Sequence, residues 1–298
     1  MTNNDPNLIS VIIPCRCNAN ELKKCIQGIK IQEIPHEVIV LDSTSNDSVA
    51  NVTSQFDNVH LVPCSPDLLP GGARNLGTRY ARSEYLLFID ADCIPESGWI
   101  MSAISALKAG AKIASGPILD KFPFHPVAFV DNLLQFADFP LNRPNGISSY
   151  FPGCNLALTR TVFIELGGFP DDLPAGEDVI FSSLAAKRWP LGLWFVHTMR
   201  VHHSGRKKFD AFMKHQEVFG FYRGRLGLKL RPIYQHLGEK MIMAIPIIYI
   251  RFFYIISRTA RWNKPGLLRI IVFLPILLFG LAAWAKGFHR GCSKRRTE

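Results

Sequence analysis

Two aspartates separated by one residue, Asp90 and Asp92, are the first positions at which this sequence could do chemistry. They follow an apolar run at residues 85–89, which predicts a buried strand. Two carboxylates that leave a strand at this spacing can share one hard cation, because Mg²⁺ and Mn²⁺ prefer oxygen ligands and also bind phosphates. The same spacing occurs in helix caps and solvated turns, so the pair alone leaves both interpretations open.

Four further polar residues lie beside predicted elements. Asp42 directly follows the apolar run at 37–41, and Asn155 lies in a Gly-Cys-Asn sequence at 153–155. Arg74 lies in a Gly-rich helix start, where it offers a positive charge to a bound anion or, as a surface arginine, pairs with an acid. Asp178 opens a predicted helix, whose dipole favours the ionised carboxylate that a general base requires. The alternative for Asp178 is an N-terminal helix acid with no chemistry.

The elements that must position these residues alternate along the chain. Apolar runs predict strands near residues 8–13, 37–41, 59–62, 85–89 and 111–115, and helical patterns fit 19–31, 72–82, 97–109 and 178–188. This alternation predicts an α/β fold with a mostly parallel sheet covered on both faces. Ligands bind such sheets at the carboxyl ends of the strands, where Asp42 and Asp90 are expected. Residues 116–150 look less regular, as an inserted lid or binding segment would.

An ordered set of motifs over about two-thirds of the chain resembles the family 2 glycosyltransferases, which have a GT-A fold. The matching segments are SVIIP at 10–14 with Asn18, VIVLDSTSND at 38–47, GGARNLG at 71–77, LLFIDAD at 86–92, PGCNLALTR at 152–160, LGGF at 166–169 and GEDVIF at 176–181. Many members have a second Asp where Ser43 stands, so this chain departs from the pattern at that position.

The resemblance implies a glycosyltransferase that uses a nucleotide-diphosphate sugar and a divalent metal, Mg²⁺ or Mn²⁺. Asp42 would bind the nucleotide, and Asp90 and Asp92 would lie at the metal–diphosphate centre. Asp178 would be the general base, which implies direct displacement with inversion. The late histidine of the family, which can complete the metal shell, corresponds to His203, with His202 as a competing assignment. The other expected substrate-binding positions are Pro14, Asn18, Arg74, Asp90, Asn155 and Glu177.

The charge of the chain is unevenly distributed. Residues 1–200 carry 15 Lys and Arg against 20 Asp and Glu, whereas residues 201–298 carry 19 against 4. With 48% hydrophobic residues, the composition excludes a disordered chain. The acidic body and the neighbouring apolar segments favour a membrane surface over nucleic acid as the partner of the basic end.

Two long apolar stretches, residues 241–257 and 267–285, approach the length that crosses a bilayer. Arg251 lies at the middle of the first stretch, where a charge in a membrane is costly, and Arg269 lies near the end of the second. A spanning helical hairpin fits this pattern, as does an interfacial first helix with a re-entrant second. A buried pair of core helices in a soluble domain is the third interpretation.

We therefore predict three segments: a GT-A-like domain at 1–206, a basic and aromatic interfacial segment at 207–240, and two membrane-associated helices with a basic tail at 241–298. The start, MTNNDPN, has no basic segment or apolar core, so we expect no signal peptide. The expected location is the membrane, with the catalytic domain facing the cytoplasm and a glycan or lipid-linked acceptor. The alternatives are a nucleotidyltransferase of similar fold and a non-catalytic membrane-bound binding protein.

Overall fold

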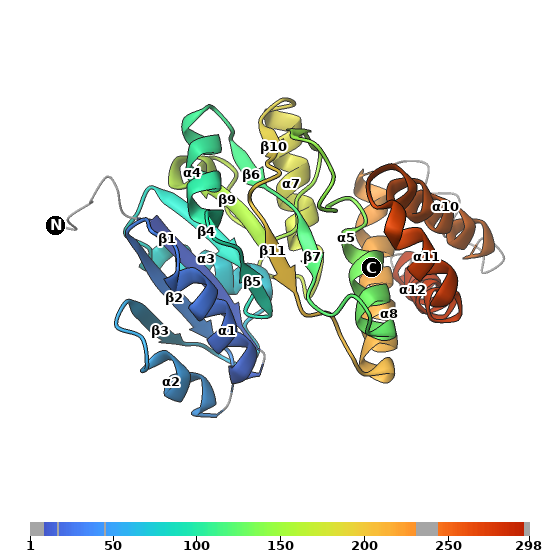
Figure 1. Cartoon of the computed structure of the whole chain (residues 1–298), viewed down its shortest axis with the longest axis horizontal. Helices are drawn as coiled ribbons and strands as arrows, with labels where there is room; N and C mark the ends of the chain where they lie inside the picture. Colours follow the sequence, from blue (N-terminus) through green and yellow to red (C-terminus); the bar gives the residue numbers. More distant parts are fainter. Residues whose placement is uncertain (1–8, 17, 45, 231–243, 295–298) are drawn as a thin grey trace. The chain divides into compact units, whose positions relative to one another are not determined.

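The computed structural model describes residues 9–16, 18–44, 46–230 and 244–294. The chain divides into two compact units (Figure 1), and each is described by itself. The first consists of Met1–Ile118 and Pro144–His203, and the second of Leu119–Arg143 and Ser204–Glu298. Residues 119–143 thus interrupt the first unit, whereas the sequence predicted one uninterrupted domain up to residue 206.

The first unit is built on an eight-stranded sheet with the strand order β3-β2-β1-β4-β9-β6-β10-β8. Strand β2 is parallel to β1 and β3, β1 is parallel to β4, and β6 is parallel to β10. Only β9 and β8 run against their neighbours in this sheet. The predicted α/β fold with a mostly parallel sheet is confirmed. The strands are β1 (Ile9–Cys15), β2 (His36–Asp42), β3 (Val59–Pro63), β4 (Tyr85–Ile89), β6 (Ile113–Ser115), β8 (Gly146–Ile147), β9 (Asn155–Thr159) and β10 (Leu193–Phe195).

Continuous apolar sequences form the central strands because both faces of the sheet are covered. In β1, β2 and β4 almost every side chain is buried, which explains why their runs do not alternate with polar residues. Cys15 lies opposite Asp42 in the register of β1 and β2, so the two carboxyl ends lie together at one edge of the sheet. The helices of this unit are α1 (Ala19–Lys30), α2 (Ser48–Thr53), α3 (Pro70–Tyr80), α4 (Trp99–Lys108), α6 (Arg160–Glu165) and α7 (Glu177–Arg188).

A short strand pair extends the first unit beyond the main sheet. Strand β5 (Cys93–Pro95) follows the Asp90–Asp92 turn and pairs antiparallel with β11 (Val201–His203). The register places His203 opposite Cys93 and His202 opposite Ile94. This pairing brings the end of the first unit next to the acidic turn. A further short strand, β7, spans Ile118–Asp120.

The second unit is helical. Its helices are α5 (Pro126–Phe136), α8 (Phe209–Leu230), α10 (Ala244–Trp262), α11 (Lys264–Val272) and α12 (Leu274–Lys294). Phe129, Leu133 and Leu134 of α5 pack with Phe212 of α8 and Leu277 of α12 in a buried core. Helix α5 was not predicted, since residues 116–150 looked irregular. Pro126 at its first turn and the His125 Nδ1, which accepts from the Ala128 N–H at 3.4 Å, begin this helix.

Helices α8 and α12 approach each other closely through glycines. A Cβ on Gly220 of α8 would lie 1.9 Å from the Trp284 carbonyl oxygen of α12, and one on Gly287 of α12 would lie 1.9 Å from the Glu217 carbonyl oxygen. One turn later, a Cβ on Gly224 would lie 2.3 Å from the Phe288 carbonyl oxygen, and one on Gly291 would lie 2.0 Å from the Phe221 carbonyl oxygen. Each helix therefore contributes a small-residue pair at a spacing of four, which lets the two backbones pack directly against each other.

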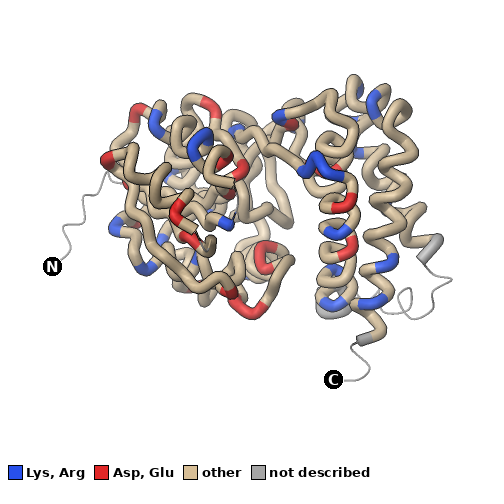
Figure 2. Tube along the Cα trace, turned by 90° about the horizontal axis from the view of Figure 1, so that it is seen from below, with Lys and Arg blue, Asp and Glu red and all other residues tan. Residues whose placement is uncertain are grey.

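Lys and Arg predominate along the helices of the second unit, whereas both basic and acidic residues occur over the first (Figure 2). Among the described residues, no single helix is long and apolar enough to cross a bilayer. Helices α11 and α12, up to Ser293, would meet the length and composition test together, but they are bent by 86° at their junction. The two predicted apolar stretches correspond to α10 and to this bent pair, and their association with a membrane stays a prediction. Residues 241–243 of the first predicted stretch lie outside the described part.

Arg251 does not face outward from the apolar helices. Its guanidinium lies over the Trp284 ring at 4.3 Å from the centroid, and one N–H donates to the Leu134 carbonyl at 2.8 Å. All three residues belong to the second unit, so the arginine at the centre of the first apolar stretch makes its contacts inside the helix bundle. In this arrangement the Arg251 guanidinium contacts protein groups of the second unit.

Candidate active site

Asp42 is held by the turn that follows β2. Its Oδ1 accepts hydrogen bonds from the Thr44 N–H at 2.8 Å and the Thr44 hydroxyl at 2.7 Å, and the side chain is largely buried. Pro14 lies beside it in β1, opposite Leu41. Asn18 caps α1, because its Oδ1 accepts from the Asn20 N–H at 2.8 Å. These residues lie at or just after the carboxyl ends of two adjacent strands, and their contacts with a nucleotide stay predictions.

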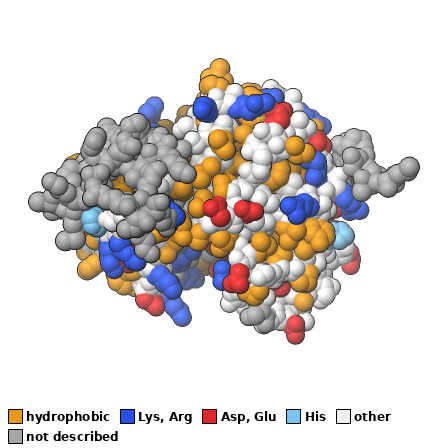
Figure 3. All heavy atoms as spheres, turned by 180° about the vertical axis from the view of Figure 1, so that it is seen from behind, with side chains coloured by type: hydrophobic (Ala, Val, Ile, Leu, Met, Phe, Trp, Pro, Cys, Tyr) orange, Lys and Arg blue, Asp and Glu red, His pale blue; other side chains and the backbone are white. Residues whose placement is uncertain are grey.

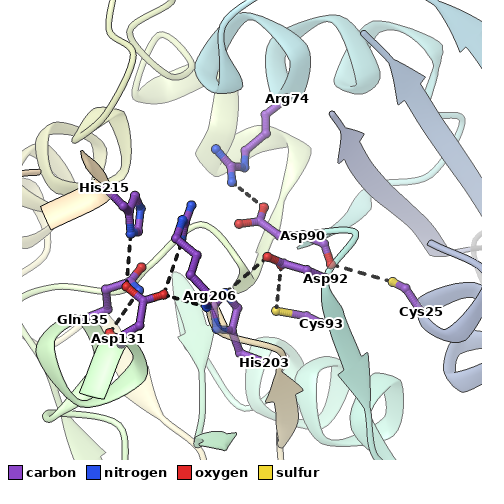
Figure 4. Close-up of polar contacts among 10 residues, drawn as sticks. All are labelled: Cys25, Arg74, Asp90, Asp92, Cys93, Asp131, Gln135, His203, Arg206 and His215. Atoms are coloured by element: carbon purple, nitrogen blue, oxygen red, sulfur yellow. Dashed lines mark hydrogen bonds and ion pairs between the residues drawn. The ribbon is translucent and has the colours of Figure 1, made fainter. Parts of the chain in front are cut away.

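Arg74 joins two acidic motifs that are far apart in the sequence. Its NH2 lies 2.7 Å from Asp90 Oδ1, and its NH1 lies 2.7 Å from Glu177 Oε1. Figure 4 shows the guanidinium directed from α3 toward Asp90. The surface-arginine alternative for Arg74 is wrong, because the residue is 3% exposed.

The guanidinium of Arg74 is enclosed by its neighbours. A Cβ on Gly153 would lie 2.7 Å from Arg74 Cζ, so a larger residue at that position would displace the guanidinium. The Phe169 ring centroid lies 5.6 Å from the same atom. Burial disfavours the charge, but the carboxylates of Asp90 and Glu177 hold the pKa of Arg74 above its ordinary value, and the residue stays a cation. Burial and the charge of Asp178 raise the pKa of Glu177 to about 7, although the positive charge of Arg74 opposes this shift.

Asp92, Cys93 and His203 form a group in which the potential ligand atoms all lie within 4.8 Å of one another. His203 Nε2 lies 3.4 Å from Asp92 Oδ2, as Figure 4 shows. The pairing of β5 with β11 creates this proximity, because it sets His203 opposite Cys93. Asp90 is absent from this group, and its Oδ1 is bound to Arg74. Its predicted role as a metal ligand stays a prediction.

The structure separates the two neighbouring histidines. His202 points to the other side of β11 and contacts Glu96, with its Nε2 2.8 Å from Glu96 Oε1. His203, which is nearly buried, contacts Asp92. Because side chains alternate along a strand, only one of the two can face the acidic turn. The structure therefore places His203, rather than His202, beside Asp92.

Asp178 occupies the second position of α7 and is partly exposed. Its Oδ2 accepts hydrogen bonds from the Tyr150 hydroxyl at 3.1 Å and from the Gly153 N–H at 3.2 Å. The preceding residue, Glu177, binds Arg74, so the two acids of this motif have different partners. Sequence analysis missed Tyr150, which belongs to none of the recognised motifs and lies 28 residues before Asp178.

The side chain of Asn155 lies in the interior of the first unit. It is fully buried, its Oδ1 accepts from the Trp99 indole N–H at 2.9 Å, and its Nδ2 donates to the Met199 carbonyl at 2.9 Å. The residue thus ties β9 to α4 and to the segment before β11, and its predicted role in substrate binding stays a prediction.

A second polar cluster, also drawn in Figure 4, lies in the second unit around Asp131 of α5. The fully buried carboxylate accepts hydrogen bonds from the Arg206 backbone N–H at 3.0 Å and from the Gln216 side-chain amide at 3.1 Å. It also contacts His215 Nδ1 at 3.2 Å. These donors outweigh burial and lower the pKa of Asp131. The cluster ties α5 to α8 and to the segment that enters it, and we interpret it as structural.

Known proteins with similar sequences are glycosyltransferases. The sequence pattern of "Glycosyl transferase family 2" matches residues 10–167. Glycosyltransferase AglE of Haloferax volcanii is 26% identical over 216 residues, which cover 70% of this chain and 70% of that protein. Pre-mycofactocin glycosyltransferase of Mycobacterium tuberculosis is 26% identical over 184 residues, but these cover 57% of this chain and only 37% of that protein.

A similar fold occurs in the mannosyltransferase PcManGT from Pyrobaculum calidifontis, solved in complex with GDP-Man and Mn²⁺. The TM-score is 0.61 at 17% sequence identity, and the similarity covers 98% of this chain and 89% of that chain. At this identity the likeness concerns the fold, which is GT-A-like. The family pattern covers more than half of the chain and includes the Arg74 and Asp90–Asp92 motifs. We conclude that the chain belongs to glycosyl transferase family 2.

Proposed function

We propose that this family 2 glycosyltransferase moves a sugar from a nucleoside diphosphate donor to an acceptor hydroxyl by direct displacement, with Asp178 as the general base. The observation that carries the proposal is the connection of three distant motifs within the first unit. Arg74 links the Asp90 turn to the Glu177–Asp178 motif, and β11 brings His203 to Asp92. These contacts assemble acids, a cation and an imidazole at the carboxyl edge of the sheet, where α/β proteins bind their ligands.

The side chains beside β5 fit a divalent metal. Asp92 offers a carboxylate oxygen and His203 an imidazole nitrogen, and their potential ligand atoms lie within 4.8 Å of each other. Carboxylate suits Mg²⁺ and Mn²⁺, and the imidazole extends the set toward Mn²⁺. Asp92 and His203 would hold the ion, which stabilises negative charge on the leaving diphosphate. A metal-dependent glycosyltransferase is therefore the activity that this set of side chains supports.

Asp178 is placed to accept the proton of the acceptor. As the acceptor oxygen forms its bond to the anomeric carbon, the bond from that carbon to the diphosphate oxygen breaks. The electron pair leaves with the nucleoside diphosphate, and the acceptor proton passes to the Asp178 carboxylate. The position of Asp178 in the first turn of α7 favours its ionised form. One base and one displacement imply inversion at the anomeric carbon.

The product identifies the reaction. The wild-type chain is incubated with Mn²⁺, a membrane extract as the source of acceptors, and a panel of GDP-mannose, UDP-glucose and UDP-N-acetylgalactosamine. We expect sugar transfer with release of a nucleoside diphosphate from at least one donor. Release of pyrophosphate from nucleoside triphosphates in the same assay, without sugar transfer, would instead identify the nucleotidyltransferase alternative. Absence of both products with every donor would favour the non-catalytic alternative.

The second unit supports a membrane-associated enzyme. Large apolar side chains are exposed along one face of α10 and one face of α11, with further examples on α12: Tyr249, Ile250, Phe253, Leu268, Ile271, Val272, Leu278 and Phe279. Basic residues lie on the same helices, and Figure 3 shows Lys and Arg side chains gathered on the surface of this unit. An apolar face flanked by positive charge is typical of a helix in the interface of an anionic membrane.

We further propose that the acceptor is a glycan or a lipid-linked glycan at the membrane, and that the catalytic unit faces the cytoplasm. The bent geometry of α11 and α12 and the apolar side chains on α10 and α11 favour an interfacial arrangement over a straight hairpin. The basic flanks favour the cytoplasmic side, since positive residues near apolar segments are retained there. The acidic character of the first unit and the exposed apolar helices speak against nucleic acid as a partner.

A further inference from the structure

The segment before β9 is fastened to α7 at a buried residue. The Phe151 N–H donates to Ser182 Oγ at 3.1 Å, and the Ser182 hydroxyl donates to the Phe151 carbonyl at 3.0 Å. Ser182 and Phe151 are both almost fully buried. Ser182 follows Asp178 by four residues on the helix, so the two side chains lie on the same face one turn apart. The segment is thus fixed directly beside the proposed base.

Two donors from this segment hold one oxygen of Asp178. The Tyr150 hydroxyl and the Gly153 N–H, on either side of the fastened Phe151, both bind Oδ2 at 3.1 and 3.2 Å. The backbone of Tyr150 is also held in place, because the Ser148 hydroxyl donates a hydrogen bond to the Tyr150 carbonyl oxygen at 3.0 Å. No hydrogen bond from a described residue reaches Asp178 Oδ1. The carboxylate is therefore oriented through Oδ2, and Oδ1 is left to the substrate.

We infer that Tyr150 is a positioning residue, which fixes the Asp178 carboxylate through Oδ2 so that Oδ1 takes the proton of the acceptor hydroxyl. This inference rests on the proposed role of Asp178 as the base. A base acts efficiently only when its accepting atom lies within hydrogen-bond reach of the reacting proton. A carboxylate that can rotate spends part of its time in unproductive orientations, and a displacement of about 1 Å at a reacting group can cost on the order of 100-fold in rate.

Tyr150→Phe tests the inference, because it removes the hydroxyl and keeps the ring. Release of nucleoside diphosphate is measured with Mn²⁺, membrane extract and whichever donor of the GDP- and UDP-sugar panel the wild type uses fastest. We expect kcat to fall roughly 10- to 100-fold, as the loss of a hydrogen bond to a charged group implies. The donor KM should stay within about twofold, because the hydroxyl contacts the base and not the donor.

Tyr80→Phe is the matched control. Tyr80 belongs to the same unit, ends α3 and is 55% exposed, so loss of its hydroxyl should leave both constants unchanged. Thermal unfolding of both variants and their binding of the product nucleoside diphosphate with Mn²⁺ should match the wild type. A merely structural role for Tyr150 would alter these two measurements along with kcat, and that result would overturn the inference.

Asp178→Asn separates failure of this inference from failure of the proposed function. If Asp178→Asn is inactive while Tyr150→Phe keeps its full kcat, the positioning role is overturned and the base remains. A raised KM in Tyr150→Phe with unchanged kcat would also overturn it, since that result assigns the hydroxyl to substrate binding. If Asp178→Asn is fully active, the base assignment is wrong and the role of Tyr150 falls with it.

Discussion

Arg74 determines how the acids around it are used. One guanidinium binds Asp90 and Glu177, each at 2.7 Å, so neither acid is available as an isolated negative charge. Asp92 lies two residues after Asp90, and Asp178 directly follows Glu177. Neither is bound to Arg74: Asp92 contacts His203, and Asp178 accepts a hydrogen bond from Tyr150. In this arrangement Arg74 organises the two motifs, while Asp92 lies with His203 and Asp178 remains partly exposed to a substrate. Breaking a buried charge pair costs about 3–5 kcal/mol, so the network is also structural.

The two neighbouring histidines make a matched pair of variants for the metal site. His203→Ala removes a potential ligand beside Asp92, and we expect the Mn²⁺ concentration for half-maximal activity to rise at least about 10-fold. His202→Ala removes only a partly exposed contact with Glu96, which is worth about 0–1 kcal/mol, so its Mn²⁺ dependence should match the wild type. A Mn²⁺ titration of activity measures both. Equal responses of the two variants would show that His203 is not a ligand.

At the scale of elements, the packing of α8 against α12 depends on glycines. Gly287→Ala would place a Cβ 1.9 Å from the Glu217 carbonyl oxygen, and we expect it to destabilise the chain by about 1–3 kcal/mol. Gly146→Ala in β8 is the control, because no atom lies within 4 Å of a Cβ at that position. Thermal unfolding distinguishes them: the first should melt at a lower temperature and the second as the wild type. Equal melting temperatures would contradict this close packing.

The elements that the sequence predicts correctly are those with a local signal. Continuous apolar runs identify β1, β2 and β4, and their order places Asp42 and Asp90 at one edge of the sheet. Helix α5 was missed because its Pro and Phe residues look irregular, although it buries its apolar face against distant helices. A helix whose stability comes from such tertiary packing has little local signature.

The candidate site shows the same limit. Motifs identify Asp92, Asp178 and Arg74, but nothing local shows that Arg74 binds an acid 103 residues away. The burial of Asn155 and the contact of Tyr150 with Asp178 also depend on tertiary structure. The choice between His202 and His203 required the register of β11 with β5. Sequence therefore identifies the chemical groups, and long-range pairing determines which of them meet.

At the scale of the whole molecule, the net charge of +10 combines an acidic first part with a strongly basic end. The basic end coincides with helices that expose apolar side chains, which is the combination expected for attachment to anionic lipid. The positive charge and the exposed apolar side chains of this part of the chain both support the proposed membrane attachment.

Vesicle sedimentation of the full chain tests membrane attachment. We expect binding to vesicles of phosphatidylglycerol and phosphatidylcholine, weaker binding to pure phosphatidylcholine, and loss of the difference at high salt. An Ile271→Asp/Val272→Asp double variant on α11 should bind at least about 10-fold more weakly, because it removes two exposed apolar side chains. Ile164→Asp in α6 is the control, since Ile164 is 67% exposed and Ile271 69%. Equal loss in both variants, or wild-type binding in both, would contradict attachment through α11.

The most direct test of the central claim is the rate of nucleoside diphosphate release by Asp178→Asn. The substitution keeps the size of the side chain and its position at the start of α7 but removes the carboxylate that takes the proton. With the donor that the wild type uses fastest, we expect a loss of at least about 100-fold in kcat, within the contribution of a general base. Asp172→Asn, at an exposed position before α7, should retain wild-type activity. Full turnover by Asp178→Asn would contradict the account.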